Sequence, residues 1–600
     1  MRQGLAALVI VAATFIAYAP AIRGGFVWDD DRYLTENRVI PAPDGLKRIW
    51  ITTLFDKQTS QYYPLTYTTF WLEYRLYGGF EPAGFHIFNV LLHACNALLV
   101  GCVLKYLKIP GAWAAAAIFA LHPVHVESTA WITERKNVLS AFFYLLAMLA
   151  FLRYEDRRQL RWYAAAFLSF CLAMLSKTAF CTLPAALILI RWFRRKPIAV
   201  GYVASLIPFF AVGIGLGLVT AWYEIRHVGA GAGEPALSFA QRILLAGRAL
   251  WFYPAKLTWP SPIIFNYPRW DLDPADARQW FFPAGVGAVA MIVWRLRHRI
   301  GRGPAAALAF MAGTLVPALG FFDVFYFRYS FVADHFQYIS SLGWIALITG
   351  VATWGLRRFV QREHPRRLLG STLCGCLCLA LGAKTSSVGR MYENKETLWR
   401  ETIRQNPRGH LAYNNLGIEL RQRGHLLEAE QHFRASLQRN PRYVPAMTNL
   451  GSAVLAQGKP AEAEPWFRKA IATNPAHPHV HYNLGSFLLN RKRYAEAAEA
   501  FRDEIRVNPV HAGAYASLGG ALLHLGQNDE ARRYLTTAIE KMPELAYAHY
   551  NLGWSLAFKK RYAEAIPHFQ RAVALEPENP QFRRELQSAR QSLEAQPRAK

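Results

Sequence analysis

Residues 408–441 read RGHLAYNNLGIELRQRGHLLEAEQHFRASLQRNP, and this stretch decides the fold of the C-terminal part of the 600-residue chain. Its Leu-Gly pair recurs every 34 residues, at 416–417, 450–451, 484–485, 518–519 and 552–553. An alanine follows each glycine after twelve residues and a large apolar residue after sixteen, as Ala429 and Phe433 do in the first unit. Prolines close the units at Pro407, Pro441, Pro475, Pro509, Pro543 and Pro577. Small residues let two helices approach, the large residue fills the groove, and proline ends the second helix, so the pattern predicts stacked helix pairs.

This spacing is identified as the tetratricopeptide repeat, with five full units over residues 408–580. Residues 386–407 are interpreted as a connector and capping half-repeat in which Trp399 takes the phenylalanine position, and residues 581–600 as a helical extension or tail. Such arrays form a right-handed superhelix with a concave binding surface.

A polar residue stands before each Leu-Gly pair: Asn415, Asn449, Asn483, Ser517 and Asn551. The asparagines resemble the ladder in the repeat domain of the cytosolic O-linked N-acetylglucosamine transferase, whose amides grip an extended polypeptide. An amide suits this role because it offers a donor and an acceptor. The alternative is repeat consensus, with these side chains capping or joining helices. The four asparagines are therefore candidate peptide-binding residues.

Residues 1–385 consist of apolar runs separated by basic loops, which indicates a polytopic helical membrane domain and an all-α chain. A helix needs roughly 17–25 apolar residues to cross a bilayer. We expect eleven spans, near residues 4–22, 85–104, 112–131, 137–153, 161–176, 179–193, 199–221, 279–294, 304–322, 337–356 and 368–384. The first is interpreted as a retained anchor, because Pro20 would hinder cleavage after Ala19. For residues 238–257 we expect an amphipathic helix in the outer interface, with two additional spans as the alternative.

Basic residues fall in every second connection, and the positive-inside rule places those connections and the N-terminus on the inner face. The connections hold Lys105 and Lys108, Arg153 to Arg161, Arg191 to Lys196, Arg295 to Arg302, and Arg357 to Arg367. An odd number of spans then places the repeats on the outer face. The same rule explains the net charge of +27 without a nucleic-acid partner. The CGCLC stretch at 374–378 lies in an expected span without histidine or carboxylate companions, so no metal site is predicted.

Three aspartates follow the first span, in GGFVWDDDRYLTEN (24–37), and are expected on the outer face. A carboxylate here can act as a general base toward a hydroxyl, and a second can orient it or raise its pKa. Because three adjacent side chains cannot all face one site, at most two of Asp29, Asp30 and Asp31 should matter directly. The alternative is a solvated acidic turn.

Other charged residues are expected near the same face. HPVHVESTAWITERKN (122–137) and SKTAF (176–180) bring Glu127, Arg135, Lys136 and Lys177 there. Ionisable groups at a membrane are costly and often functional, and the basic ones suit a lipid phosphate, with snorkelling to headgroups as the alternative. FFDVFYFRYSFVADHFQYISSLG (321–343) adds Asp323, Arg328, Asp334 and His335 among aromatic residues.

Six features follow one another along the chain: FVWDD, HPVHVESTAWITERKNVLS, LSK, WFYPAKLTWPSPIIFNY, VADHFQYISSLG and the repeats. This order resembles the transmembrane and tetratricopeptide-repeat-containing O-mannosyltransferases and their bacterial relatives, of the GT-C class of polytopic glycosyltransferases. The resemblance covers about residues 5 to 580. The membrane motifs carry it, because unrelated proteins share the repeats. It implies a GT-C-like membrane domain followed by an α-solenoid.

The resemblance implies transfer of mannose or another hexose from a polyprenyl-phosphate donor to a serine or threonine hydroxyl of a protein recruited by the repeats. It implies that Asp29 is the base and Asp30 its helper, with Asp31 a solvated neighbour. The groups implied for the departing phosphate are Arg135, Lys136 and Lys177. The remaining candidates for the donor or sugar site are His125, Glu127, Arg328, Asp334 and His335. The lipid-linked donor is a substrate, no cofactor is certain, and a divalent metal is possible but not predicted.

Two other functions are alternatives. One is a non-catalytic scaffold whose repeats assemble envelope proteins. The other is a lipid-linked glycan polymerase, ligase or transporter, which the repeats disfavour because such reactions need no polypeptide groove. Composition favours a multi-pass protein of a bacterial inner membrane with periplasmic repeats over one of the endoplasmic reticulum with lumenal repeats. The expected partners are the lipid donor and a protein.

Overall fold

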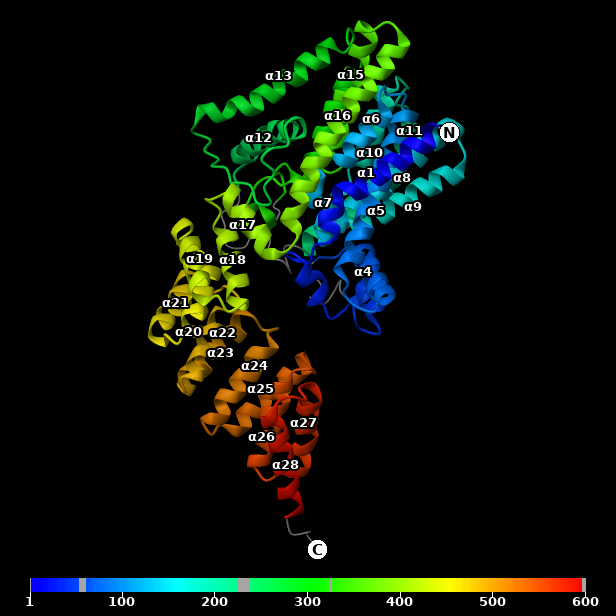
Figure 1. Ribbon diagram of the computed structural model, residues 1–600. Helices are drawn as coiled ribbons and strands as arrows, with labels where there is room; N and C mark the ends of the chain where they lie inside the picture. The colour runs from blue at the N-terminus through cyan, green and yellow to red at the C-terminus, as the bar shows by residue number, and fades with distance from the viewer. Residues whose placement is uncertain (1, 53–60, 224–236, 323–324, 596–600) are drawn as a thin grey trace. The chain divides into compact units, whose positions relative to one another are not determined.

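The computed structural model describes residues 2–52, 61–223, 237–322 and 325–595, and within these ranges it contains helices and no strand. This confirms the predicted all-α fold. The chain divides into two compact units, Met1–Gly409 and His410–Lys600. Figure 1 shows the helices of both units.

The first unit has a helix at or near each expected span. These helices are α1 (Arg2–Ile22), α5 (Pro82–Tyr106), α6 (Ala112–Leu121), α8 (Arg135–Arg157), α9 (Leu160–Ser176), α10 (Leu183–Phe193), α11 (Val200–Tyr223), α13 (Phe281–Leu296), α14 (Gly303–Leu315), α15 (Ser341–Phe359) and α16 (Glu363–Gly389). Among the described residues, six helical segments are long and apolar enough to cross a membrane, and several others are shorter apolar helices. The multi-pass character is therefore supported, whereas the number of eleven crossings stays a prediction.

The predicted span at 112–131 is wrong in its second half, because α6 ends at Leu121. The chain continues as η3 (Pro123–His125), α7 (Val126–Ala130) and η4 (Ile132–Glu134) before α8 begins. His122 is extended, with φ −76° and ψ 125°, as expected for a residue before proline, and Pro123 cannot continue the helix. Similarly, the predicted span at 337–356 begins only at Ser341, after η10 (Asp334–Gln337). Both breaks fall where the sequence places candidate site residues.

The connection after α1 is a folded subdomain with its own apolar core. Its helices are η1 (Asp31–Thr35), α2 (Gly45–Lys47), η2 (Arg48–Thr52) and α4 (Pro64–Tyr77). Tyr33, Leu34 and Phe70 are buried in one cluster with Phe85 of α5 and Ile132 of η4. The acidic segment is therefore anchored to the membrane helices by apolar packing.

The remaining elements of this unit connect the long helices. They are η5 (Thr178–Phe180), α12 (Phe239–Thr258), η7 (Ala277–Trp280), η8 (Val316–Ala318), η9 (Phe325–Arg328), η11 (Arg390–Tyr392) and α17 (Lys395–Gln405). α12 is the helix expected at 238–257, and it buries Leu245, Ala249 and Tyr253 on one face while Trp251 is exposed. Its interfacial position stays a prediction. Trp399, expected in a half-repeat, is buried in α17 within the first unit.

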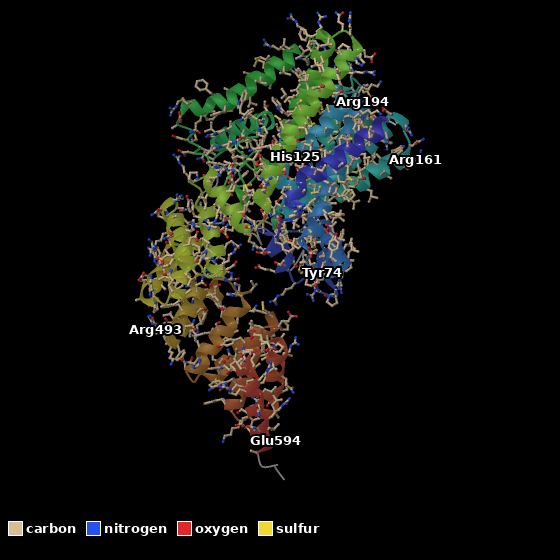
Figure 2. The ribbon with its side chains drawn as sticks, viewed as in Figure 1. Tyr74, His125, Arg161, Arg194, Arg493 and Glu594 are labelled. Carbon is tan, nitrogen blue, oxygen red and sulfur yellow. The ribbon has the colours of Figure 1, made fainter. Side chains whose placement is uncertain are left out.

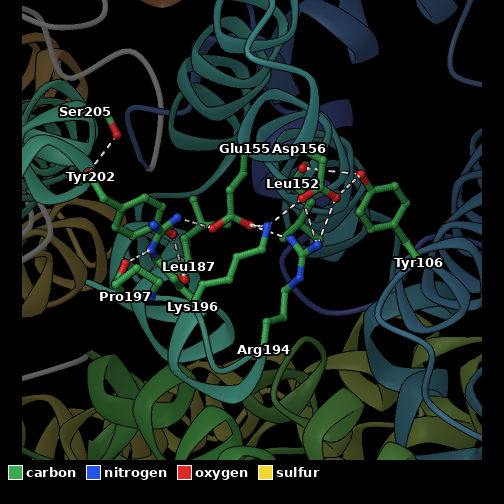
Figure 3. A network of polar contacts seen from close by, with 11 residues as sticks. Tyr106, Leu152, Glu155, Asp156, Leu187, Arg194, Lys196, Pro197, Tyr202 and Ser205 are labelled. Atoms are coloured by element: carbon green, nitrogen blue, oxygen red, sulfur yellow. Dashed lines mark hydrogen bonds and ion pairs between the residues drawn. The ribbon is translucent and has the colours of Figure 1, made fainter. Parts of the chain in front are cut away.

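The two ends of α8 carry separate charge networks. At its C-terminal end, Lys196 pairs with Glu155 at 3.3 Å and with Asp156 at 2.6 Å (Figure 3). Glu155 also pairs with Arg191 at 2.5 Å. Glu155 lies twenty positions after Arg135, which corresponds to about 30 Å of helix, the thickness of a bilayer core. This network consists of residues predicted to face inward, and the orientation itself stays a prediction.

Opposite ends of the first unit are visible in Figure 2, which places Tyr74 of α4 at one end and Arg194 of the network at the C-terminal end of α8 at the other. α1 and α16 lie side by side and end together (Figure 1). The amide of Gly25 donates to the carbonyl of Glu393 at 2.9 Å. A Cβ on Gly24 would lie 2.7 Å from the carbonyl oxygen of Tyr392, so this approach requires glycine. The shared end agrees with an odd number of crossings between the two helices.

The second unit contains the five predicted helix pairs and a final helix. Their bounds are α18 (His410–Gln422), α19 (Leu426–Arg439), α20 (Val444–Ala456), α21 (Pro460–Thr473), α22 (Val480–Asn490), α23 (Tyr494–Val507), α24 (Ala512–His524), α25 (Asn528–Lys541), α26 (Ala546–Phe558), α27 (Tyr562–Leu575) and α28 (Pro580–Glu594). A Cβ on Gly451 would lie 2.9 Å from the Phe467 ring, and the other Leu-Gly glycines are equally close to their large partners. This confirms the prediction that the small residue lets the two helices of a repeat approach and that the large residue fills the groove between them.

Candidate active site

The chain leaves α1 through a strained tryptophan. Trp28 has φ +45°, in the left-handed region that costs a non-glycine residue roughly 1–2 kcal/mol. Its ring lies 4.9 Å from that of Trp399 and 5.1 Å from that of Phe265, centroid to centroid. This aromatic packing holds the strained backbone and thereby sets the direction of Asp29 and Asp30.

Asp30 is completely buried and ties the acidic segment to η4. Its Oδ2 accepts the amide of Val27 at 2.9 Å, and its Oδ1 accepts the amide of Thr133 at 2.9 Å. Burial raises the pKa of Asp30 to about 7, although both amide hydrogen bonds oppose this. Because each oxygen already accepts an amide, Asp30 is placed to position the segment, and its helper role toward Asp29 stays a prediction.

Asp29 is only half-buried, and its backbone carbonyl accepts the amide of Tyr33 at 2.9 Å. Burial raises the pKa of Asp29 to about 6, while the nearby positive charges of Lys136 and Arg32 hold it lower than burial alone would. A carboxylate with a pKa just below neutrality is ionised at pH 7 and is still basic enough to accept a proton. Asp29 therefore has the properties of a general base.

Asp31 points elsewhere. It forms an ion pair with Lys395 at the start of α17, and its side chain is 30% exposed. The expectation of a merely solvated neighbour is wrong in this respect, because Asp31 joins the acidic segment to α17.

Glu134 lies at the centre of a lysine pair formed by Lys136 and Lys177. Its Oε1 is 2.9 Å from Nζ of Lys136, and its Oε2 is 3.3 Å from Nζ of Lys177 and accepts Nδ2 of Asn137 at 2.6 Å. The two lysine side chains are 10% and 13% exposed. Two ammonium groups share one carboxylate, so the centre keeps one positive charge. The sequence prediction brought the lysines together but missed Glu134, although it directly precedes Arg135.

Arg135 does not fit its predicted phosphate role. It is completely buried, and its Nε donates to Asn89 Oδ1 at 2.7 Å while one Nη donates to the carbonyl of Phe85 at 2.8 Å. The remaining donors reach Glu73 of α4 and the hydroxyl of Thr69. All five N–H groups are engaged, which leaves none for a phosphate. Arg135 instead fastens α4, in the subdomain after α1, to α5 and α8.

Glu127 and His335 are brought together from distant parts of the chain. Glu127 Oε1 lies 2.9 Å from His335 Nδ1, and Oε2 accepts the His335 amide at 2.9 Å. The carbonyl of His335 accepts Nδ2 of Asn137 at 3.0 Å, which connects this pair to the Glu134 centre. The pair joins α7 to η10 beside the lysine pair.

Asp334 is buried next to Tyr267, whose hydroxyl donates to it at 2.8 Å, and Gln337 donates at 3.0 Å. Burial, followed by the negative charge of Glu127, raises the pKa of Asp334 above its ordinary value, against the lowering effect of Tyr267 and Lys256. The environment of Asp334 therefore favours its neutral form. The sequence analysis did not single out Tyr267 or Gln337, which lie in an aromatic connection and in the first turn before α15.

The other residues predicted for the donor site lie in different places. His125 is buried, with its ring nitrogens 2.8 Å from the Phe119 carbonyl and 2.9 Å from Ser341 Oγ, so it is a packing residue. Arg328 lies in η9 and is half-buried. Asp323 falls outside the described residues.

The predicted asparagine ladder lies on the first helices of the repeats, and part of it joins neighbouring repeats. Nδ2 of Asn449 donates to Asn414 Oδ1 of the preceding repeat at 3.0 Å, and Asn414 donates to Asn415 at 3.1 Å. Asn483 is half-buried, and the buried Nδ2 of Asn551 has no hydrogen-bond partner among the described residues. At Asn449 the structure thus supports the interhelix alternative, whereas Asn415, Asn483 and Asn551 stay candidates for peptide binding.

Comparison with known proteins finds relatives for both units. Residues 64–222 match the family model described as dolichyl-phosphate-mannose-protein mannosyltransferase. The tetratricopeptide repeat model matches residues 414–478, 448–509, 482–541 and 517–580. The first match includes Glu134, Lys136 and Lys177 but begins after Asp29 and Asp30.

Curated relatives include the human protein O-mannosyl-transferase TMTC4, 32% identical over 24% of this chain and 22% of that protein. The Drosophila melanogaster protein O-mannosyl-transferases Tmtc2 and Tmtc1 are 34% and 35% identical, over 25% of this chain and 17% and 18% of theirs. The chain therefore matches about a fifth of the length of these relatives. Among solved structures, the MamA protein is 24% identical over 28% of this chain and 92% of that one, with a TM-score of 0.25. The resemblance predicted from the motifs is confirmed: this chain is similar to protein O-mannosyl-transferases, to the dolichyl-phosphate-mannose-protein mannosyltransferase family over residues 64–222 and to tetratricopeptide-repeat proteins in its C-terminal part.

Proposed function

We propose that this chain is a membrane glycosyltransferase that moves mannose or another hexose from a polyprenyl-phosphate donor to a serine or threonine hydroxyl of a protein. The observation that carries the proposal is Asp29, a half-buried carboxylate with a pKa of about 6, held within electrostatic reach of Lys136. A base and a phosphate-binding centre side by side are what this transfer needs. The similarity to protein O-mannosyl-transferases supports the choice of reaction.

In the proposed step, the acceptor oxygen attacks the anomeric carbon while the bond from that carbon to the phosphate oxygen breaks. The hydroxyl proton passes to Asp29, and the bonding electrons leave with the lipid phosphate. Asp30 contributes by fixing the backbone on which Asp29 stands, through the amides of Val27 and Thr133. General-base assistance of this kind typically contributes 10²–10⁴-fold to a rate.

The lysine pair supplies the positive charge for the leaving group. Glu134 keeps the two ammonium groups together before the donor arrives, because like charges in so buried a place would otherwise repel. When phosphate binds, the two ammonium groups can donate to its oxygens, and charge-assisted hydrogen bonds are strong in a site that excludes water. Lys136 and Lys177, without Arg135, are the proposed phosphate ligands.

The repeats are proposed to recruit the protein acceptor, since concave tetratricopeptide surfaces bind polypeptides. The proposed location is a bacterial inner membrane, with the reaction on its outer face. The alternative of a non-catalytic scaffold is distinguished by the same experiment as the proposal itself.

That experiment uses the full-length protein in nanodiscs with a polyprenyl-phosphate hexose and a mixture of envelope proteins. Mass spectrometry then scores hexose on serine and threonine. We expect transfer by the wild-type protein and by Asp31→Asn, which removes a carboxylate of the same triplet that pairs with Lys395. Asp29→Asn should abolish transfer. If folded Asp29→Asn protein transferred sugar as fast as wild type, or if wild type transferred none, the proposal would be rejected.

A further inference from the structure

One repeat departs from its own pattern at a buried position. Glu504 stands on α23 where the second helices of the other repeats carry Ser436, Ala470, Ala538 and Ala572. Its side chain is 0% exposed. A buried carboxylate at a position that is small in the other repeats needs hydrogen-bonding or charged partners to offset the cost of its desolvation.

The first helix of the same repeat, α22, begins late next to Glu504. α20, α24 and α26 all begin at the same position of the 34-residue repeat, and the equivalent position in the third repeat is residue 478. α22 begins two residues after this position, at Val480. His479 has φ +69°, a left-handed conformation unfavourable for histidine. The amides of His479 and Tyr482 donate to Glu504 at 3.0 and 3.3 Å. The backbone strain and the buried carboxylate thus belong to one local feature.

Two imidazoles complete this feature, one from the same repeat and one from the next. Nδ1 of His511 lies 3.2 Å from Glu504 Oε1, and Nδ1 of His479 lies 3.6 Å from the same oxygen. Ligand atoms of the three residues all lie within 4.8 Å of one another. In a tetrahedral zinc site with bonds of about 2.1 Å, neighbouring ligand atoms lie about 3.4 Å apart. The two distances from the histidine nitrogens to Glu504 Oε1, 3.2 and 3.6 Å, lie on either side of this value.

We propose that His479, Glu504 and His511 form a binding site for a divalent transition-metal ion, with Zn²⁺ the best match to two imidazoles and one carboxylate. His479 is 56% exposed, so the fourth coordination position opens to solvent. The ligating carboxylate is itself oriented, because Oε2 accepts the Tyr482 amide and Asn508 approaches Oε1 at 3.5 Å. Such supporting hydrogen bonds are typical of metal ligands.

The ion would join the N-cap of α22, the last turn of α23 and the N-cap of α24. It would therefore fasten the third repeat to the fourth at the point where α22 begins late. An ion that binds only the folded stack stabilises it by mass action, and it limits changes of curvature at this junction.

The test titrates chelator-treated full-length protein in detergent with Co²⁺, followed by competition with Zn²⁺. We expect one Co²⁺ per chain, with visible ligand-field absorption that Zn²⁺ abolishes. Glu504→Ala restores the residue of the other repeats and His511→Leu introduces the residue found at Leu545, so both variants should fold. Each should weaken Co²⁺ binding more than about a hundredfold. The matched control is His568→Gln, which alters the imidazole pair of His549 and His568 in the last repeat and should leave binding unchanged.

Circular dichroism is used to check that each variant is folded. Wild-type protein that shows no stoichiometric Co²⁺ signal, or Glu504→Ala protein that binds Co²⁺ as tightly as wild type, would overturn the proposal and leave the cluster as a hydrogen-bonded helix start. Neither result touches the proposed transferase activity, because the titration requires no sugar donor.

Discussion

Lowering the pH from 8 to 5 should slow sugar transfer by the wild-type protein about tenfold, because it protonates Asp29. With a pKa of about 6, Asp29 is almost fully ionised at pH 8, half ionised at pH 6 and about one-tenth ionised at pH 5. If Asp29 is the base, kcat/KM follows this ionised fraction. Asp29→Asn should lower kcat by roughly 10²–10⁴-fold and remove the acid limb from whatever activity is left.

Asp30→Asn discriminates between the two neighbouring carboxylates. The asparagine would place its amide nitrogen against one of the two backbone N–H groups that Asp30 accepts, at a cost of about 1–3 kcal/mol in the free energy of unfolding. Activity should fall through misplacement of Asp29, but the acid limb near pH 6 should persist. Because the pKa of Asp30 is raised in the folded state, its contribution to stability is greatest at acid pH and is lost as the pH rises through about 7.

The assay measures kcat and kcat/KM between pH 5 and 8 with a water-soluble short-chain polyprenyl-phosphate hexose and a peptide acceptor. Asp31→Asn, outside the base and its support, serves as the control. The reasoning is refuted if Asp29→Asn keeps an acid limb near pH 6, or if the limb disappears in Asp30→Asn and survives in Asp29→Asn.

Three further outcomes follow from individual contacts. Arg135→Met should lower the free energy of unfolding by about 3–5 kcal/mol, because it leaves the buried carboxylate of Glu73 without its partner. The double variant with Glu73→Met should recover most of this stability in thermal unfolding. A stable Arg135→Met protein that had lost donor binding would contradict the structural role. Lys177→Met should lower kcat by about 10²–10³-fold by removing charge from the departing phosphate; a change in KM alone would count against that role. Gly451→Ala should cost about 1–3 kcal/mol, measured by denaturant titration, because its Cβ meets the Phe467 ring at 2.9 Å; unchanged stability would show that the ring moves aside.

The repeats were predictable because their determinants are local. The Leu-Gly glycine and its large partner lie sixteen residues apart in one helix pair, so the sequence period carries the packing directly. The membrane helices were predictable from length and hydropathy, but their breaks were not. The helix expected at 112–131 ends at Leu121, and the residues beyond it are stabilised by remote partners, such as the Glu127 contact with His335.

The same distinction explains the site. Asp29 and Asp30 are adjacent and chemically identical, and only the amide of Thr133, about a hundred residues later, separates a base from its support. Arg135 and Lys136 are likewise adjacent, yet one faces Glu73 and the other faces Glu134. Adjacent residues on a helix point in different directions, so sequence proximity to a motif does not determine which charge serves the site.

Charge balance at the site leads to one more prediction. With Asp29 ionised, Asp29 and Glu134 offset Lys136 and Lys177, so the four groups together are neutral. A bound donor adds the negative charge of its phosphate. That charge opposes ionisation of Asp29, and it also engages Lys136, which in the free protein helps to keep the pKa of Asp29 down.

Donor binding should therefore raise the pKa of Asp29. At a separation of about 6 Å, one negative charge contributes about 0.7 kcal/mol even in bulk water, which is about half a pH unit, and more where water is excluded. Because kcat/KM reports the free enzyme and kcat the donor complex, the acid limb of kcat should lie about 0.5–1 pH unit above that of kcat/KM. Single-turnover rates ensure that the chemical step is observed. A kcat limb at or below the kcat/KM limb would mean that the phosphate does not bind within reach of Asp29, and the lysine pair would lose its proposed role.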